Sequence, residues 1–207
     1  MKSNFSESLL STAYLPPVEY MSVIYRSDIV EIEQCENYQK QSYRSRCHIY
    51  SANGPLPLII PVERSGTHSI PVKDIRIDYS RRWQQQHWRA IVSAYRMSPF
   101  FEYYEDDFAP FYTKEEPFLF DFNTKLTELL LSLTGIRKCI SFTEIYKKET
   151  GTGVTDFREL IHPKRESLPE MKNGQYHQVF AHKSGFIPNL SSLDLLFNEG
   201  PDSISYL

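Results

Sequence analysis

Residues 9–33 read LLSTAYLPPVEYMSVIYRSDIVEIE, and this stretch decides the fold that the sequence predicts. Leu9–Tyr14 is typical of a short strand, which a Pro-Pro pair ends. Because proline fits the first turn of a helix, we expect a helix over Val18–Tyr25. Asp28–Glu33 alternates acidic and apolar residues, as a half-buried strand does. A strand, a helix and a second strand in this order predict a parallel β-α-β unit.

Turn residues and hydrophobic periodicity predict the rest of the fold. Asn53-Gly54 is a strong hairpin signal, and Gly135 is well placed to end a helix. Ser191 followed by Asp194 predicts a capping box. We expect an α/β fold with a mixed β-sheet, a β-hairpin and flanking helices. The further strands are expected over Tyr38–Tyr50, Leu56–Val62, Val72–Ile77, Lys138–Tyr146 and Tyr176–Phe180, the further helices over Trp83–Tyr95, Phe122–Leu133 and Ser191–Asn198, and a loop over Lys147–Gly174.

The size and composition of the chain fit one folded domain. Its 207 residues are enough to bury a core, so we take residues 1–207 as a single domain. The net charge of −3 gives no reason to expect nucleic-acid binding. The three cysteines form no CxxC pair, as is typical of free thiols in a reducing compartment. The first ten residues lack the apolar run of a signal peptide, and the longest apolar stretch, Leu56–Val62, is too short to span a bilayer. We therefore expect a cytoplasmic protein without a membrane span.

A row of positive charges lies just before the predicted hairpin turn. Read as a strand, residues 40–48 place alternate side chains on one face, because strand side chains alternate with period two. Charges crowded in this way repel one another, so something should neutralise them. The sequence leaves two alternatives open: a cradle for a small anionic ligand, which arginine's forked donors match, or a face paired with protein carboxylates. The residues on that face are Lys40, Ser42, Arg44, Arg46 and His48.

Other candidate residues have more than one interpretation. His87, in the middle of a predicted helix, could act as a general acid or base, but such a histidine is more often a packed residue. The aromatic and acidic segment Phe100–Tyr112 has the composition of a sugar-binding surface, although core packing is the more frequent meaning. The histidines are scattered without metal-ligand spacing, so we expect no metal site. Glycine-rich phosphate loops and a serine nucleophile elbow are absent from the sequence.

Several short motifs, in a fixed order, together resemble one known family. They are LPPVEYMSVI, NYQKQSYRSRCHIYSANG, LIIPVE, VKDIRID, WQQQHWRAIVSAYRMSPFFEYY and FIPNLSSLDLLFNEGP. Each is weak alone, but their number and order are specific, and from Leu9 to Leu207 the chain resembles the WbqC-like protein family. Related sequences often open with a Gln-Pro-x-Tyr-Phe-Pro motif, where this chain has Tyr14-Leu15-Pro16-Pro17, and Ser45 stands where an Asn is frequent before Arg46. The family's motif positions correspond to Pro16, Lys40, Arg44, Arg46, His87, Trp88, Tyr95, Pro99, Ser191 and Asp194.

The resemblance implies a role in bacterial surface-polysaccharide biosynthesis, of O-antigen or capsule, and it leaves the cofactor unknown. We expect a group transferase that acts on a phosphorylated or nucleotide-linked sugar. For the basic residues 40–48, such a ligand favours a cradle for a small anion over a solvated strand face paired with protein carboxylates. A non-catalytic module that binds a sugar nucleotide or a partner enzyme is the main alternative, and a structural assembly protein is a third. The residues expected at the site are His48 and His87 for catalysis, and Lys40, Arg44, Arg46, Pro16, Ser191 and Asp194 for ligand binding.

Overall fold

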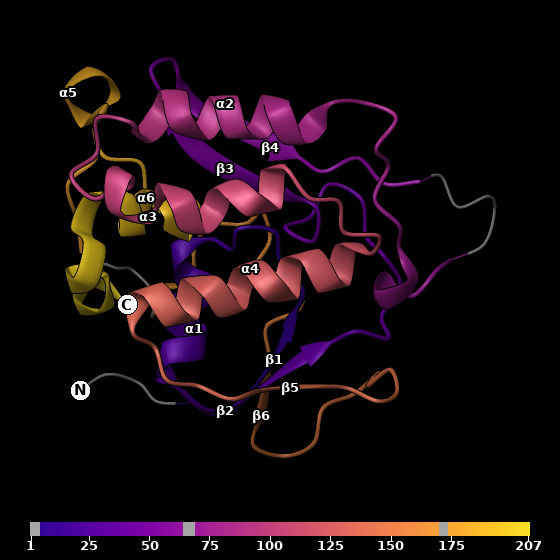
Figure 1. Ribbon diagram of the computed structural model, residues 1–207. Helices are drawn as coiled ribbons and strands as arrows, with labels where there is room; N and C mark the ends of the chain where they lie inside the picture. Colours follow the sequence, from indigo (N-terminus) through magenta and orange to yellow (C-terminus); the bar gives the residue numbers. More distant parts are fainter. Residues whose placement is uncertain (1–4, 64–68, 170–173) are drawn as a thin grey trace.

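Two β-sheets and a layer of helices make up the structure (Figure 1). It is a computed structural model, which describes residues 5–63, 69–169 and 174–207. The α/β class is confirmed, and the parallel and antiparallel pairing lie in separate sheets. The strands are β1 (Phe5–Ser11), β2 (Ser27–Glu33), β3 (Arg46–Ser51), β4 (Gly54–Ile59), β5 (Ile140–Phe142) and β6 (Val154–Asp156), and the α-helices are α1 (Val18–Arg26), α2 (Trp83–Tyr95), α3 (Phe101–Phe108), α4 (Leu119–Thr134), α5 (Ala181–Ser184) and α6 (Ser192–Glu199).

The predicted β-α-β opening is confirmed. β1 and β2 are parallel neighbours, with Leu10 opposite Ile32 in the ladder. α1 connects them and is buried along its first seven residues, which explains its largely apolar sequence. β1 starts and ends earlier than predicted. After Ser11 the chain leaves the sheet, and the backbone N–H of Tyr14 donates to the carbonyl of Tyr43 instead of to a neighbouring strand (2.9 Å).

The larger sheet has the strand order β5-β2-β1-β6, and all its neighbouring strands are parallel. β6 has three residues and pairs only with β1, in a segment where the sequence predicts a loop. Because the strands are parallel, their carboxyl ends meet at one edge of the sheet. β1 has β2 as its neighbour on one side, to which α1 connects it, and β6 as its neighbour on the other side. The strand order therefore reverses between β1 and β6.

The predicted hairpin of β3 and β4 is present, but its two turn residues are Ala52 and Asn53, and Gly54 is already the first residue of β4, opposite Ser51. β4 contains two prolines and ends at Ile59, two residues before Pro61. The predicted strand over Tyr38–Tyr50 is wrong in its first half, because residues 40–45 form turns. Gln41 there adopts a left-handed φ of 59°, which interrupts the extended conformation that the alternation of charges had indicated.

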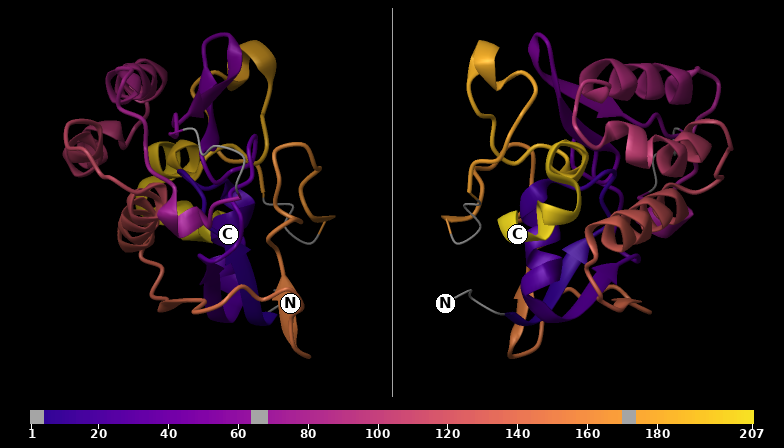
Figure 2. Two further views of the ribbon diagram at one scale, coloured as in Figure 1. Left: turned by 90° about the vertical axis from the view of Figure 1, so that its right-hand side faces the viewer. Right: turned by 60° about the vertical axis from the view of Figure 1, so that its left-hand side comes forward.

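Helices α2, α3 and α4 stack beside the hairpin and the larger sheet (Figure 1). Figure 2 shows them on one side of the hairpin, with the segment after β6 on the other side. α2 spans the predicted residues, and Gly135 ends α4 with a φ of 74°. The aromatic segment after α2 contributes to the core, since Phe101 and Phe108 are buried against Phe197 of α6.

Three other predicted strands are shorter or absent. Val72–Asp74 forms a 3-10 helix after Pro71, so the strand predicted over Val72–Ile77 is wrong. The strand over Lys138–Tyr146 shrinks to β5. Residues 176–180 form no strand, because side-chain hydrogen bonds rather than a ladder hold them. Residues 170–173 of the predicted loop over Lys147–Gly174 lie outside the described residues. Within the described ranges, no helix has the length and apolarity needed to cross a bilayer.

Candidate functional site

A cavity of about 730 Å³ lies between the outer face of β3 and the segment after β6. Tyr50 of β3 holds this segment in place, because its hydroxyl donates to the carbonyls of Phe180 (3.2 Å) and Gly185 (2.8 Å). The cavity is therefore walled on one side by a strand and on the other by loops from much later in the chain. Among the residues that line it are Val18, Tyr43, His48, Arg165, Asn189 and Leu190.

His48 is the predicted catalytic residue that lines the cavity. It is half-buried, and the ring of Tyr43 packs edge-on against its imidazole, with centroids 6.3 Å apart. Burial and the nearby positive charge of Arg46 lower the pKa of His48, so the imidazole is neutral at pH 7. Burial raises the pKa of the Tyr43 hydroxyl, which therefore stays protonated. The wall thus offers a neutral base beside a phenol that can donate a hydrogen bond.

Behind this wall lies a buried carboxylate that the sequence reading missed. Glu19, in the first turn of α1, is 3% exposed, and its Oε2 accepts from the backbone N–H of Leu168 (3.2 Å). Burial raises the pKa of Glu19, against hydrogen bonds from Asn189, Leu168 and Ser167 that lower it. Glu19 thus ties α1 to the loops that close the cavity. A lone Glu after a Pro-Pro pair carries no local signal of such a role.

The N-termini of α1 and α6 are joined at the edge of the cavity. The N–H of Val18 donates to the carbonyl of Leu190 (3.0 Å), and the N–H of Ser192 donates to the carbonyl of Pro16 (2.8 Å). The N–H of Glu19 donates to Oδ1 of Asn189 (3.0 Å). These hydrogen bonds occupy the free N–H groups at the start of α1, so the groups are not available to bind an anion there.

Ser191, Pro16 and Asp194, which the sequence predicts to bind the ligand, are buried and are not among the described residues that line the cavity. Ser191 is the N-cap of α6, as predicted: its hydroxyl accepts from the N–H of Leu193 (3.3 Å), and its own N–H donates to the carbonyl of His48 (2.8 Å). The predicted capping box is incomplete, because Asp194 turns away from Ser191. Its Oδ2 accepts instead from the hydroxyl of Tyr176 (2.7 Å) and the amide of Gln178 (2.8 Å).

The predicted basic face is divided among three places. Lys40 is exposed on a turn, and Arg44 is buried away from the cavity, in an ion pair with Glu36. Arg46 and His48 lie two residues apart in β3 and so share one face of the strand. A shared strand face is therefore wrong for Lys40 and Arg44 and correct for Arg46 and His48.

His87 lies in the aromatic core rather than at the cavity. Its Nδ1 shares a hydrogen bond with the hydroxyl of Tyr14 (2.9 Å), and its ring packs between those of Tyr14 and Trp83. Burial lowers the pKa of His87 to about 4, against a backbone hydrogen bond to Ile59 that raises it. These contacts are those of a packed histidine with satisfied hydrogen bonds.

Comparison with protein-family models identifies one family for this chain. The model of the WbqC-like protein family matches residues 12–161. The chain is also similar to a protein of Mycobacterium tuberculosis (strain ATCC 25618 / H37Rv), described as uncharacterized protein Rv1507c, with 25% identity over 225 residues that cover 97% of this chain and 96% of the relative. No solved structure matches the chain.

Proposed function

This chain belongs to the WbqC-like protein family, and on that premise we propose that it is a cytoplasmic group transferase of bacterial surface-polysaccharide biosynthesis. Family membership suggests the role in polysaccharide biosynthesis. The observation that supports an enzyme is the cavity of about 730 Å³ with His48 in its wall. A pocket of this size accepts a nucleotide-linked or phosphorylated sugar.

Two arginines at or near the cavity can bind an anionic donor, and among the described residues the lining holds one carboxylate, that of Glu166. Arg165 lines the cavity from the later loop, and Arg46 is close enough to His48 to lower the pKa of that histidine. Either guanidinium offers paired N–H donors to a phosphate. Lys40 and Arg44 are not assigned to this ligand, because one lies on an exposed turn and the other is engaged with Glu36.

His48 has the properties of a general base in such a transfer. A neutral imidazole takes the proton from the acceptor's hydroxyl or amine as that atom bonds to the transferred group. The bond between that group and its phosphate or other leaving group breaks, and the leaving group keeps the electron pair. We assign His87 a structural role, because its ring nitrogens are engaged within the core.

Thermal shift with a panel of nucleotide sugars, sugar phosphates and acyl-coenzyme A donors tests the proposal, because a ligand that binds only the folded state raises Tm. At least one donor should raise the Tm of the wild type and of His182→Ala, an exposed histidine outside the cavity lining. Arg165→Ala should reduce that shift. If no donor shifts Tm, or if the shift survives both Arg165→Ala and His48→Ala, the cavity is not the donor site.

Catalysis is tested separately from binding. With the donor found, product formation from candidate acceptors is followed by mass spectrometry in the wild type and in His48→Gln. Loss of a general base should lower turnover by about 10²–10⁴-fold while the Tm shift remains. A donor that binds the wild type with no product from any acceptor would instead favour a non-catalytic sugar-nucleotide or partner-binding module.

A further inference from the structure

A second cavity, of about 660 Å³, lies at the carboxyl edge of the parallel sheet. Ligands of open α/β sheets bind outside the carboxyl ends of the strands, near the point where the strand order reverses. The residues that line this cavity follow β2, β5 and β6, whose carboxyl ends all lie at that edge. They are Cys35, Glu36, Asn37, Tyr38, Gln39, Tyr146, Lys148, Asp156, Arg158 and Glu159.

The arginines at this edge are already neutralised by the protein. Arg158 donates to both oxygens of Asp156 (Nε to Oδ1 at 3.0 Å, Nη2 to Oδ2 at 2.6 Å) and to Glu33 (3.3 Å). Arg44, just behind the lining, is engaged with Glu36. An anionic ligand would have to compete with these fixed carboxylates for the same N–H groups. Lys148 adds an exposed cation to the lining, but the carboxylates of Glu36, Asp156 and Glu159 outnumber the positive groups there, and this charge balance disfavours phosphate in the cavity.

Oxygen acceptors remain available in the same cavity. The side chain of Glu159 is 55% exposed, and its Oε1 accepts from the amide of Gln39 (2.6 Å), so several of the about four acceptor positions of this carboxylate stay open. The oxygens of Asp156 are instead occupied by the backbone N–H and the guanidinium of Arg158. Asn37 is exposed and adds amide donors. These groups match the hydroxyls of a neutral ligand, which both donate and accept.

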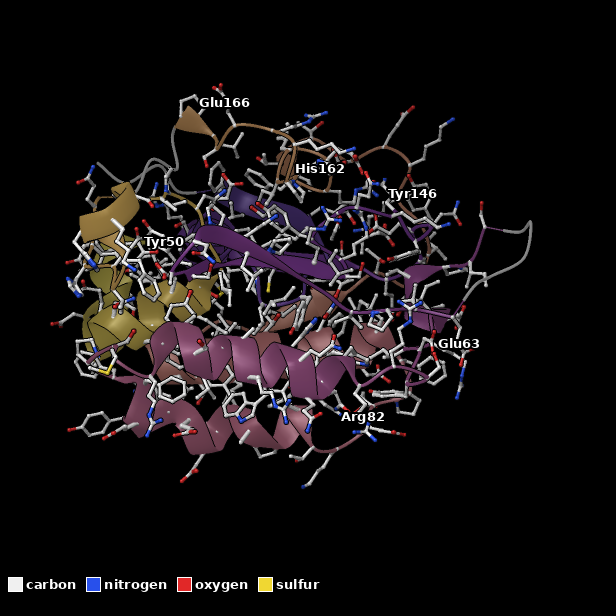
Figure 3. All side chains as sticks on the ribbon, turned by 90° about the horizontal axis from the view of Figure 1, so that it is seen from above. Tyr50, Glu63, Arg82, Tyr146, His162 and Glu166 are labelled. Atoms are coloured by element: carbon white, nitrogen blue, oxygen red, sulfur yellow. The ribbon has the colours of Figure 1, made fainter. Side chains whose placement is uncertain are left out.

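Tyr146 adds a flat apolar surface at the rim. The guanidinium carbon of Arg158 lies 5.4 Å from its ring centroid, and the side chain is still 53% exposed. Figure 3 shows Tyr146 at the outer edge of the molecule, on the side away from α2. An exposed aromatic ring beside carboxylates and amides is the combination that binds sugars, because the ring packs on C–H groups while the polar side chains bond the hydroxyls.

We propose that the cavity at the carboxyl edge of the parallel sheet, bordered by Tyr146, Asn37, Asp156 and Glu159, is a binding site for a neutral saccharide. This site is separate from the His48 cavity and does not depend on the ligand of that cavity.

Saturation-transfer difference NMR with neutral sugars tests the site. The probes are glucose, galactose, mannose, N-acetylglucosamine and their common disaccharides, with inorganic phosphate as the anionic comparison. At least one sugar should bind the wild type, and Tyr146→Ala should weaken it about tenfold. Asn37→Ala should also weaken it. Both positions are exposed, and circular dichroism verifies that each variant folds.

Two controls locate the binding. Tyr103→Ala removes a tyrosine that is 77% exposed on α3, outside the cavity, and should leave sugar binding unchanged. His48→Ala should also leave it unchanged, which separates this site from the His48 cavity. The proposal is overturned if no neutral sugar binds, if binding survives both Tyr146→Ala and Asn37→Ala, if His48→Ala abolishes it, or if phosphate displaces the sugar.

Discussion

Arg44 and Glu36 form a buried ion pair with two parallel hydrogen bonds. Nε and Nη2 of Arg44 donate to the two carboxylate oxygens of Glu36 at 2.8 and 2.6 Å, and the two side chains are 2% and 6% exposed. Nη2 also donates to the hydroxyl of Ser11 at the end of β1 (2.8 Å), and the amide of Asn123 in α4 donates to the carbonyl of Arg44 (2.8 Å). The pair therefore joins the turn before β3 to the sheet and to α4.

Removing one member of this pair should destabilise the protein strongly. Arg44→Ala leaves Glu36 buried without its cation, which typically costs about 3–5 kcal/mol. Urea unfolding followed by circular dichroism measures the loss. The control is Lys125→Ala, which breaks the more exposed pair with Glu116 and should cost about 1 kcal/mol or less. A similar loss for both variants would contradict a structural role for the Arg44–Glu36 pair.

His87 and Asp194 should make opposite contributions to the pH dependence of stability. Burial lowers the pKa of His87 from 6.5 to about 4, so its unfolded form binds more protons in this interval, and its contribution to stability is lost as pH falls. Burial raises the pKa of Asp194 from 3.8 to about 6, so its folded form binds more protons, and its contribution is lost as pH rises. The two effects largely cancel between pH 4 and 6.

Single substitutions should separate the two contributions to the change of unfolding free energy with pH. Relative to wild type, His87→Phe should lose stability with rising pH between 4 and 6, and Asp194→Asn should gain it, each by up to about 3 kcal/mol. Guanidinium unfolding at pH 4, 5 and 6 measures the slopes, which are independent of any constant loss from repacking. Parallel pH profiles in all three proteins would show that neither group is coupled to folding.

Tyr50 should control the order of the cavity's outer wall. Tyr50→Phe removes the two hydrogen bonds to the carbonyls of Phe180 and Gly185 while keeping the ring, so the global loss should be about 1 kcal/mol. The local effect should be larger, with faster trypsin cleavage after Lys183 in α5. Tyr103→Phe, on the exposed face of α3, serves as the control. Equal cleavage rates in the two variants would rule out this anchoring role.

Gly200, after α6, should not tolerate a side chain. Its φ is 54°, and a Cβ there would lie 2.5 Å from the ring of Phe100. Gly200→Ala therefore combines backbone strain with overpacking and should cost about 2–4 kcal/mol. Gly135→Ala has the same kind of φ, 74°, but nothing lies within 4 Å of its Cβ, so it should cost about 1–2 kcal/mol. Thermal unfolding compares the pair, and equal losses would mean that Phe100 moves aside freely.

Local signals were sufficient for several elements of the fold. The Pro-Pro pair started α1, Asn53-Gly54 placed the hairpin, and Gly135 ended α4. Residues 40–45 misled because polar alternation also occurs in turns, and their conformation is fixed by partners such as Glu36 and Asn123 that lie elsewhere in the chain. β6 was missed because three residues carry little periodicity and become a strand only by pairing with β1.

The candidate site could be predicted only in part. His48 was predicted as a site residue because it follows a row of basic residues close to the hairpin turn, and it lines the cavity. Ser191 was predicted as an N-cap because it precedes an amphipathic helix, and it caps α6. Arg165 and Asn189 lie in loops more than 100 residues after β3, and no spacing in the sequence links them to it. Tertiary packing alone brings these residues to one cavity.

The exchange of hydrogen bonds between the starts of α1 and α6 has a consequence for how the chain is made. Synthesis proceeds from the N-terminus, so α1 emerges with the N–H groups of Val18 and Glu19 lacking the partners that residues 189 and 190 later provide. β1 likewise lacks its neighbour β6 until more than 140 further residues have been translated. Contacts of such sequence separation slow folding. The N–H groups at the start of α1 therefore gain these partners only after residue 190 has been translated, so any truncation before Asn189 leaves both groups without them.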